Sequence, residues 1–554
     1  MNSLNAIKAF RSVLDKANDY VVIDTETTWL TGIREDRQLM GVSIHVDGQS
    51  AYIPVGHTSY FHDVPKNQII PSDYFDCISC SVVFHNAKFD ISVLAQAGCP
   101  VPTERVMDTM IMAHVIDENR RNYSLDQLAK AYGCTNKATE TSKVMKQNWN
   151  NMPVVAMMSY ACVDVVATAE LYEKLLPLYE EHKDLWENYD RQFMLLLAKM
   201  EDKGIPLDGE MCKDLEIKTK IRMVQIEAEL GFDPSKPSLL RSKLFSEPPV
   251  GFGLKPLSFT PKKQEPQVNK AFLERTNHPV CGLLLEYSQL KKYLTSYFVP
   301  YQKKAGLAGR LYPSFRQHGT VTGRLSCAEP NLQQIPRESY VKDVFMPERG
   351  CHLVEIDYSN IEMRLAVVYS QQPELLAEFS ARNGDVHGRV AKSLGIERFK
   401  AKVVNFLIIY GGGAKALAYQ LKISEGEARK IINGMRKSYP EIFTTMKRAE
   451  NACQHNGGNV RLWSNRVRHF PYQSEYHKAF NSVVQGGAFE IVKRSMLLLD
   501  ESGFDIRNQV HDSVWLNVQD LNTVKEAESI MEGWVEQEFG LPFYVESKIL
   551  RSNV

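Results

Sequence analysis

Two aspartates stand at the ends of short apolar segments, where a metal ion could use their carboxylates. Asp357 closes the apolar segment 353–356, and Asp512 separates two apolar runs within 508–518. These patterns predict a buried strand that ends at Asp357 and a hairpin with Asp512 at its tip. A carboxylate at such a place is costly unless something binds it, and Mg²⁺ takes one or two carboxylates plus substrate phosphates. A pair could hold two metals roughly 3.5–4 Å apart, the arrangement used for in-line phosphoryl transfer.

A second set of acids lies in the first third of the chain. Asp24 and Glu26 fall two residues apart in the apolar segment 20–28, so they share one face of a predicted strand. Two such charges repel each other unless a cation lies between them. Asp90 follows another predicted strand, which begins at residue 82. Tyr160 and Asp164 are four apart in a predicted helix and therefore project together.

A third pattern combines cationic and aromatic side chains at helical spacing. Arg398, Lys402, Phe406 and Tyr410 recur every four residues and precede three glycines at 411–413. On a helix they form one slowly drifting stripe, cationic at one end and aromatic at the other. A nucleoside triphosphate needs cations for its phosphates and a flat surface for its base. The alternative is an amphipathic helix whose aromatic side chains belong to the core.

Three further segments carry polar side chains in regular patterns. Gly323 permits a tight turn beside Arg324, whose fork of donors suits a phosphate or a base edge. His387 lies at the head of a probable helix that follows Asp385. Asn481 and Gln485 form a polar pair at helical spacing.

The elements around these residues indicate several domains, as the length of 554 residues does. Further strands are predicted at 40–46 and 51–55, which suggests a mixed sheet, and a helix at 107–114. Helices are predicted at 185–230 and 271–301, with a proline-rich loop at 247–266 between them. Basic residues recur there, either as a solvated surface or as a clamp on phosphates. They are Lys218, Lys220, Arg222, Arg241, Lys243, Lys262, Lys263, Lys291, Lys292, Lys303 and Lys304.

The composition is that of an ordinary globular protein, with 44% hydrophobic and 24% charged residues and a net charge of zero. Zero net charge argues against a histone-like binder but leaves room for a local basic groove. The ten cysteines are scattered, and Cys77 and Cys80 form a lone pair without a second one, so we expect a reducing compartment and no zinc. No signal-peptide core is visible, and no run reaches the about 18–20 apolar residues of a spanning helix. We expect a soluble intracellular protein.

The acids of the first third resemble a known family. The order D-x-E, N-x-x-x-D and Y-x-x-x-D is similar to that of the DEDDy 3′→5′ exonucleases of proofreading domains, over nearly all of residues 1–185. The resemblance implies that Asp24, Glu26, Asp90 and Asp164 bind two divalent metals. It also implies that Tyr160 helps to position the attacking water. Because all five residues are present, we expect an active nuclease.

The remainder, about residues 186–554, resembles the family A DNA polymerases of the DNA polymerase I type. The resemblance rests on T-G-R-L-S around Arg324, D-Y-S-x-I-E-x-R from Asp357, R-x-x-x-K-x-x-x-F-x-x-x-Y-G from Arg398 and Q-V-H-D ending at Asp512. It implies an α/β protein with a ribonuclease H-like exonuclease domain followed by a right-hand palm, fingers and thumb. The expected domains are the exonuclease at 1–185, a helical thumb at 186–310, and palm and fingers at 311–554, with the fingers at about 366–500.

The same resemblance implies a role for each patterned residue. Asp357, Asp512 and the carbonyl of Tyr358 would bind metal, with two Mg²⁺ here, two at the exonuclease site, and Mn²⁺ as a substitute. The residues implied to hold the triphosphate are Arg398, Lys402 and His387. Phe406 and Tyr410 would line the nascent base pair, and Glu362 would exclude a ribose 2′-OH. The residues implied to touch primer or template are Arg324, Asn481, Gln485 and His511.

The chain departs from the family at several positions. Ser513 stands where the family usually has an accessory Glu after His-Asp, and we expect activity to survive this change. Leu407 replaces a common Gly, which we expect to alter fidelity or nucleotide handling. Phe406 in place of Tyr implies poor use of dideoxynucleotides. No 5′ nuclease domain precedes residue 1 of this sequence, as in phage or organellar replicative enzymes or in a truncated chain.

Three functions follow from these patterns. The first is a DNA-templated DNA polymerase with proofreading, in replication or repair, with primer-template DNA and dNTPs as partners. We expect a monomer without membrane association, a processivity factor as a further partner, and a place in the nucleoid, an infected cell's cytoplasm or an organelle. The second is a single-subunit RNA polymerase, against which Glu362 and the nuclease count. The third is a DNA-binding scaffold with only a working nuclease, against which Asp357 and Asp512 count.

Overall fold

The computed structural model describes residues 11–17, 19–28, 37–57, 67–136, 151–337, 340–382 and 384–554. The chain forms two compact units. The first contains Met1–Gly204, Tyr312–Gln334 and Glu348–Val554, and the second contains Ile205–Leu311 and Ile335–Pro347. The first unit therefore holds the nuclease region together with most of the chain after residue 311, and one division between the units falls after Gly204.

The first unit begins with a five-stranded mixed sheet in the order β3-β2-β1-β4-β5. Strand β1 pairs antiparallel with β2 and parallel with β4. The strand bounds are β1 Tyr20–Thr27, β2 Leu39–Val46, β3 Gln49–Pro54, β4 Ser81–Phe84 and β5 Val106–Asp108. Nearly every residue of β1 is buried, because apolar side chains such as Val21 and Ile23 pack into one core. The mixed sheet predicted from the sequence is confirmed, although Met107 and Asp108 lie in a strand rather than in the predicted helix.

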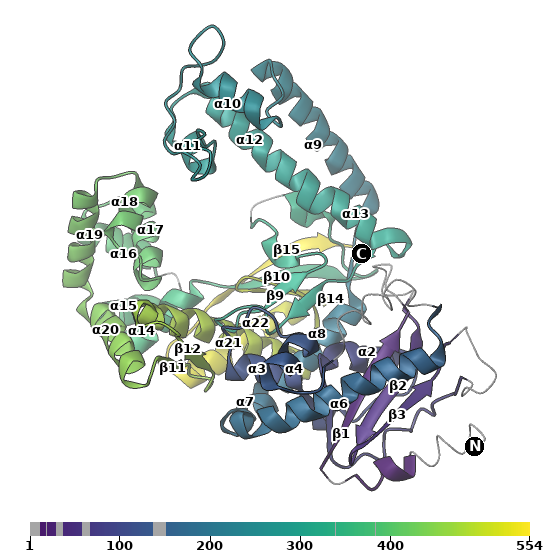
Figure 1. The fold of residues 1–554 in the computed structure, drawn as a ribbon. Coiled ribbons are helices and arrows are strands. Elements are labelled where there is room, and N and C mark those ends of the chain that lie inside the picture. Colours follow the sequence, from purple (N-terminus) through teal and green to yellow (C-terminus); the bar gives the residue numbers. More distant parts are fainter. Residues whose placement is uncertain are drawn as a thin grey trace. The chain divides into compact units, whose positions relative to one another are not determined.

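Helices α2 and α6 pack on this sheet, as Figure 1 shows for the long helix α6 beside the strands, and helices α3 and α4 pack on α6. Their bounds are α2 Ala87–Gln96, α3 Thr109–Ile116, α4 Leu125–Tyr132 and α6 Val154–Tyr179. The continuous helical stretch Val154–Lys203 is long and apolar enough to cross a membrane by length and composition alone, with 44% of its most apolar window buried. The sequence reading had found no such run. Because α6 packs on β1, β2 and β3, it serves as a core helix of this sheet.

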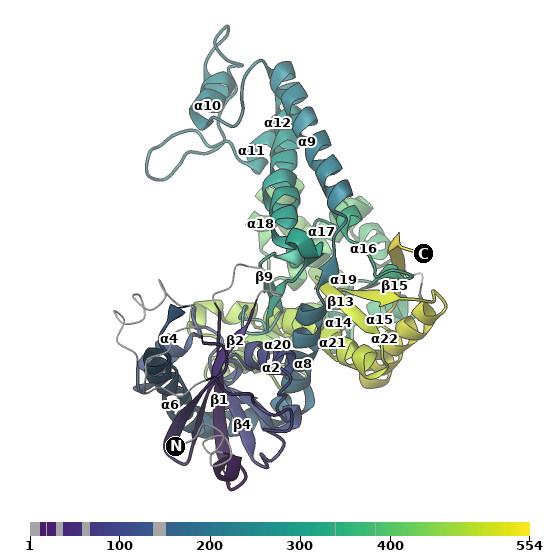
Figure 2. The ribbon, with the colours of Figure 1, turned by 90° about the vertical axis from the view of Figure 1, so that its right-hand side faces the viewer.

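A second sheet of the first unit is antiparallel, in the order β13-β14-β10-β15. Its bounds are β10 His352–Tyr358, β13 Asp505–Val510, β14 Ser513–Val518 and β15 Val545–Ser552. Strand β10 ends at Tyr358, one residue after Asp357, and the β13–β14 hairpin carries Asp512 at its tip, as predicted. Helices α14 Ile361–Ser370, α21 Ala479–Glu501 and α22 Thr523–Phe539 lie next to these strands in Figure 2.

Six helices of the described chain follow α14, before the small hairpin that precedes α21. These helices are α15 Pro373–Ser380, α16 Val386–Leu394, α17 Arg398–Ile409, α18 Ala414–Leu421, α19 Glu425–Ser438 and α20 Pro440–His455. Asp385 caps α16, because its side chain accepts a hydrogen bond from the Gly388 amide at 2.9 Å. A capping box of Ser424 and Glu427 starts α19. A small hairpin of β11 Asn459–Arg461 and β12 Val467–His469 precedes α21.

A buried ionic cluster joins the end of the nuclease region to α21. Asp190 precedes α8 Arg191–Lys203 and accepts hydrogen bonds from Arg466 Nη2 at 2.7 and 2.9 Å, and another from Lys493. Arg466 also donates to Glu490 at 2.6 Å. All four side chains are at least nine-tenths buried. The two acids balance the two cations, which a buried group of charges requires.

The second unit is mainly helical. Its bounds are α9 Gly209–Leu230, α10 Pro237–Phe245, α11 Lys270–Arg275, α12 Pro279–Tyr293 and α13 Val299–Ala305, with a small β6–β7 ribbon of Ile205–Pro206 and Arg310–Leu311. Helices α9 and α12 run side by side in both ribbon views. Arg222 on α9 holds Glu286 on α12 through two hydrogen bonds at 2.7 and 2.9 Å. The helices predicted within 185–230 are α8 and α9, which are separated by Gly204 and the short strand β6.

Candidate active sites

The first candidate site lies on strand β1 and helix α6. Ligand oxygens of Asp24, Glu26 and Asp164 all lie within 4.8 Å of one another. Within the described ranges this is the one group of three or more acidic, His or Cys side chains close enough to share a metal ion. All of its donors are carboxylate oxygens, which suit the hard cations Mg²⁺ and Mn²⁺. The predicted convergence of these three acids is thus present in the structure.

Asp90 and Tyr160 complete the neighbourhood of this cluster. Asp90 lies on α2, 2% exposed, and its Oδ1 accepts hydrogen bonds from the amide and the hydroxyl of Thr25 at 2.9 and 2.7 Å. Asp90 is thereby fixed against the residue between Asp24 and Glu26, although it is not one of the three clustered ligands. The pKa of Tyr160 is raised mainly by burial, and the negative charges of Asp164, Glu26 and Asp24 add to this effect. Its hydroxyl therefore keeps its proton at neutral pH and can donate it in a hydrogen bond.

The second candidate site lies where β10 meets the β13–β14 hairpin. In the antiparallel pair β10–β14, Asp357 stands opposite Ser513. The amide of Tyr358 donates to the carbonyl of Asp512 at 3.3 Å. Both aspartates are partly exposed, so a ligand can reach them. The main chain at Asp357 is therefore adjacent to that at Asp512, and carboxylate oxygens are donors that suit Mg²⁺.

Glu362 on α14 connects two residues that the sequence placed in different roles. Its carboxylate accepts hydrogen bonds from the Arg324 guanidinium and from the Tyr410 hydroxyl. Glu362 is 5% exposed. Burial raises its pKa, and the charge of Arg324 opposes that rise. One buried carboxylate therefore joins the turn at Arg324 to the end of α17.

Helix α17 presents the predicted cationic and aromatic stripe. The rings of Phe406 and Tyr410 stack with centroids 6.3 Å apart, and Lys402 is exposed. Arg398 is engaged with Asp385 through two hydrogen bonds at 2.8 and 3.0 Å. These bonds hold the pKa of the Asp385 carboxyl below its ordinary value. The sequence did not predict this ion pair, although Asp385 lies only two residues before His387.

His387 and Leu407 are both buried against neighbouring elements. His387 Nδ1 lies 2.9 Å from Asn405 Nδ2, and its ring centroid is 5.9 Å from that of Phe406. Burial, together with the nearby charges of Arg398 and Lys402, lowers the pKa of His387. Leu407 packs so closely on the glycine turn that a Cβ on Gly412 would come within 2.4 Å of it. Leu407 therefore supports the turn that ends α17.

The predicted DNA-contacting residues lie on three different elements. Arg324 follows Gly323, whose φ of +78° and close approach to Arg466 leave no space for a side chain. Asn481 and Gln485 are half-buried on α21, and Asn481 Oδ1 has no hydrogen-bond partner among the described residues. His511 is exposed at the hairpin tip with φ +55°. Gln509, which the sequence reading missed, bonds to the His511 carbonyl and to Gln333.

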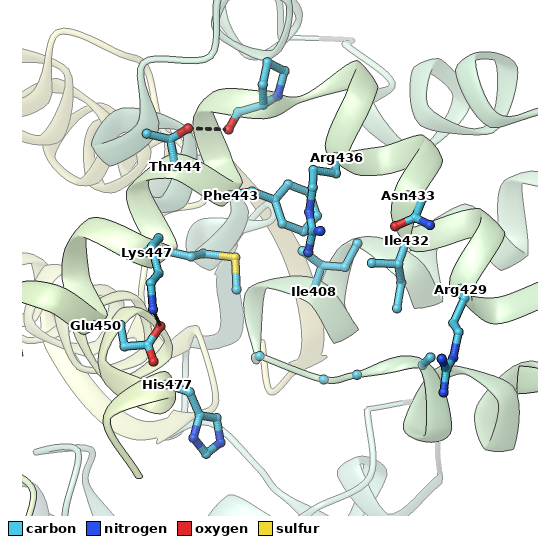
Figure 3. Close-up of a pocket in the computed structure, with 16 residues that line it drawn as sticks. Ile408, Arg429, Ile432, Asn433, Arg436, Phe443, Thr444, Lys447, Glu450 and His477 are labelled. Atoms are coloured by element: carbon cyan, nitrogen blue, oxygen red, sulfur yellow. Dashed lines mark hydrogen bonds and ion pairs between the residues drawn. The ribbon is translucent and has the colours of Figure 1, made fainter. Parts of the chain in front are cut away.

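A cleft of about 920 Å³ opens beside the glycine turn at the end of α17. Figure 3 shows Arg429, Asn433 and Arg436 from α19 on one side of it and Phe443, Lys447 and Glu450 from α20 on another. The Arg436 guanidinium lies 5.2 Å from the centre of the Phe443 ring. Sequence reasoning missed this cleft, because the glycine turn forms only one part of its lining and the side chains from α19 and α20 follow no patterned motif.

Two family models match the chain. The model for "DNA polymerase family A" matches residues 210–552, and the model for "3'-5' exonuclease" matches residues 3–180. These matches define the class of the chain: a family A polymerase domain preceded by a 3'-5' exonuclease domain. The chain belongs to DNA polymerase family A.

Curated relatives with the name DNA polymerase I match this chain at 28% identity over the aligned residues. The one from Synechocystis sp. is 28% identical and is matched over 89% of this chain and 55% of its own length. The one from Pseudomonas aeruginosa is also 28% identical, over 91% of this chain and 60% of its own length. The chain therefore spans little more than half of these relatives.

A solved structure shares the fold. The "POL domain of Pol1 from M. smegmatis complex with DNA primer-template and dNTP" superposes with a TM-score of 0.81 at 22% identity. The match covers 98% of this chain and 96% of that one.

Proposed function

We propose that this chain is a DNA-templated DNA polymerase with 3′→5′ proofreading. The observation that carries the proposal is the strand pairing that brings Asp512 beside Asp357. Strand β10 of this sheet is followed by helix α14, which carries Glu362. Family membership and the DNA and dNTP bound to the related M. smegmatis domain support it. The polymerase reaction forms a bond between the primer 3′-oxygen and the dNTP α-phosphorus and releases pyrophosphate.

Asp357, Asp512 and the Tyr358 carbonyl would hold two Mg²⁺ at the polymerase site. When bound, these ions would activate the 3′-hydroxyl and neutralise charge on the phosphates. Lys402 is exposed on α17 and would bind the triphosphate, together with Arg398 once it leaves Asp385. The stacked rings of Phe406 and Tyr410 offer a flat surface to the new base pair. His387 would contact the phosphates as a neutral donor, in keeping with its lowered pKa.

The nuclease site would hydrolyse the terminal phosphodiester of a mismatched primer. Asp24, Glu26 and Asp164, with Asp90 beside them, would hold a second pair of Mg²⁺ or Mn²⁺ ions. Tyr160 keeps its proton and would orient the attacking water by a hydrogen bond. Water adds to phosphorus, the 3′-oxygen of the preceding nucleotide leaves, and a nucleoside monophosphate is released.

DNA contacts would come from several elements. Arg324, Asn481, Gln485 and His511 would touch the primer end, the minor groove or the template. The cleft beside the glycine turn would take the single-stranded template, because Arg429, Arg436 and Lys447 line it. The helical second unit would act as the thumb. The palm and fingers would lie within residues 311–554, with the fingers at about 366–500.

The alternative of an RNA polymerase is weakened by Glu362. Its buried carboxylate, held by Arg324 and Tyr410, is suited to exclude a ribose 2′-hydroxyl. Primer extension on a recessed DNA duplex with either dNTPs or rNTPs tests the proposal. Extension with dNTPs only supports it, whereas preferred use of rNTPs would support the alternative.

We also propose that the protein is monomeric and soluble inside the cell and works with a processivity partner. Four large apolar side chains of the second unit's proline-rich loop are exposed, and they offer such a partner a surface; they are Val250, Phe252, Leu257 and Phe259. Replacing Phe252 and Phe259 by Ser tests this surface. In a lysate of the source cells, the variant should make shorter extension products than the parent. In buffer with purified protein alone, the two should make products of equal length. Unchanged lengths in the lysate would contradict it.

A further inference from the structure

The residue that follows Asp512 contacts an acid on the neighbouring strand. Ser513 is 3% exposed, and its hydroxyl lies 2.9 Å from the Val510 carbonyl and 3.1 Å from Oε1 of Glu355. The Trp515 indole N–H donates to the same Oε1 at 3.1 Å. Two residues of β14 therefore hold one carboxylate of β10.

Glu355 lies on the same face of the sheet as Asp357. The two residues are i and i+2 on β10, so their side chains project in one direction, roughly 7 Å apart along the strand. Across β14 they face Trp515 and Ser513, and across β15 they face Lys548 and Glu546. Glu355 is partly exposed, which keeps its carboxylate accessible to ions.

We propose that Glu355 supplies, from strand β10, the accessory carboxylate whose usual place is occupied by Ser513. This inference rests on the proposed polymerase function. Glu355 is a positioning residue with two effects. Its charge adds to those of Asp357 and Asp512, which favours divalent cations at this edge of the sheet. Its hydrogen bond with Ser513 also fixes the turn that carries Asp512.

The positions of the donors fix the direction of the Glu355 side chain. Two neutral donors, the Ser513 hydroxyl and the Trp515 indole, converge on one of its oxygens. Two like charges on adjacent positions of one face are unfavourable without a cation between or beside them. Lys548 lies opposite Glu355 on β15, and a metal ion near Asp357 would place a positive charge close to both acids.

The test exchanges the two residues between the strands. Glu355→Ser, Ser513→Glu and the double variant are compared with the parent in an Asp24→Asn background, which silences the nuclease. For Glu355→Ser we expect a roughly 10–100-fold lower kcat of extension, the range for partners of metal ligands, with the KM for dNTP little changed. In the double variant the carboxylate returns on the other strand, so we expect most of the loss to be restored. No better activity in the double variant than in Glu355→Ser would overturn the proposal.

A second variant separates charge from shape. Glu355→Gln keeps an oxygen acceptor for Ser513 and Trp515 but removes the charge. We expect the Mn²⁺ affinity to fall by a similar factor of roughly 10–100. The electron paramagnetic resonance signal of free Mn²⁺, recorded without DNA, measures this affinity. Parent-like Mn²⁺ affinity and kcat in Glu355→Gln would overturn the proposal and leave Glu355 as an anchor for Trp515.

Two controls make the outcome specific. Glu546→Gln removes the acid opposite Asp357 on β15, and we expect its kcat and Mn²⁺ affinity to change less than threefold. A loss equal to that of Glu355→Gln would overturn a particular role for Glu355. The 3′ shortening activity of each variant with Asp24 intact reports folding. If the parent itself fails to extend a primer, the proposed function fails; if the parent and Glu355→Gln extend equally, only this inference fails.

Discussion

The amide of Tyr358 donates a hydrogen bond to the carbonyl of Asp512 at 3.3 Å. This main-chain contact joins two acid-bearing segments that lie far apart in the sequence. The distance between Asp357 and Asp512 is therefore set by the pairing of β10 with β14, and replacing either side chain removes a carboxylate without moving the strands.

Glu362 is predicted to set sugar selectivity. In Glu362→Ala, Arg324 and Tyr410 lose their shared acceptor, and space opens where a 2′-hydroxyl would lie. We expect rNTP incorporation to rise at least about tenfold relative to dNTP, close to 1.4 kcal/mol of discrimination. Single-nucleotide kinetics with dCTP and CTP measure this ratio. Glu362→Gln is the matched control, because it keeps the volume of the side chain. Relaxed selectivity in Glu362→Gln but not in Glu362→Ala would contradict the steric explanation.

Asp385 is predicted to compete with the triphosphate for Arg398. The pair is exposed, and such pairs are worth about 0–1 kcal/mol. Replacing Asp385 by Ser keeps an N-cap for α16 but releases the guanidinium. We expect the KM for dNTP to fall by up to about fivefold, with kcat unchanged. A higher KM in steady-state extension would instead indicate that Asp385 orients Arg398 for the substrate.

The buried cluster around Asp190 is predicted to stabilise the first unit. Asp190→Asn leaves Arg466 and Lys493 without one of their two acids, which typically costs roughly 3–5 kcal/mol. Burial alone would raise the pKa of Asp190, but these two cations outweigh it and hold the pKa below its ordinary value.

The sign of the pH effect follows from that lowered pKa. The stabilisation by Asp190 is complete above its unfolded pKa of about 4 and declines as the pH falls below it. Urea unfolding of the parent and of Asp190→Asn measures this, and the gap between their unfolding free energies should narrow below about pH 4. A gap that stays constant down to the folded pKa, or widens in acid, would contradict the assignment.

The cleft in Figure 3 is predicted to bind the template overhang. Arg436→Ala should weaken binding of a duplex with a 5′ overhang and reduce the salt dependence by about one phosphate contact. Binding of a blunt duplex should not change. Fluorescence anisotropy at several salt concentrations tests this, with the exposed Lys437→Ala on the same helix as the control. Equal losses for both duplexes would argue against a template path.

The sequence predicted those parts of the two sites that depend on local periodicity. Asp24 and Glu26 share a strand face, and Phe406 stacks on Tyr410, as their spacings indicated. Asp357 lies near the end of β10, and Asp512 lies in the turn between β13 and β14. Each of these relationships follows from the repeat of one helix or strand, or from a motif shared with a family.

The contacts between distant segments were not predictable in the same way. The bond between Ser513 and Glu355 depends on which strands pair and in which register. The ion pair between Asp190 and Arg466 joins two residues that lie far apart in the sequence. The Arg398–Asp385 pair required knowledge of how α16 and α17 pack.

The most direct test compares two single variants in one assay. Asp357→Asn and Asp24→Asn are incubated with a recessed-end DNA duplex and Mg²⁺, with and without the four dNTPs. Asp357→Asn should lose extension at least about a hundredfold while it still shortens the 3′ end. Asp24→Asn should extend normally and lose shortening. Extension by Asp357→Asn at the parent's rate would contradict the assignment of the polymerase site.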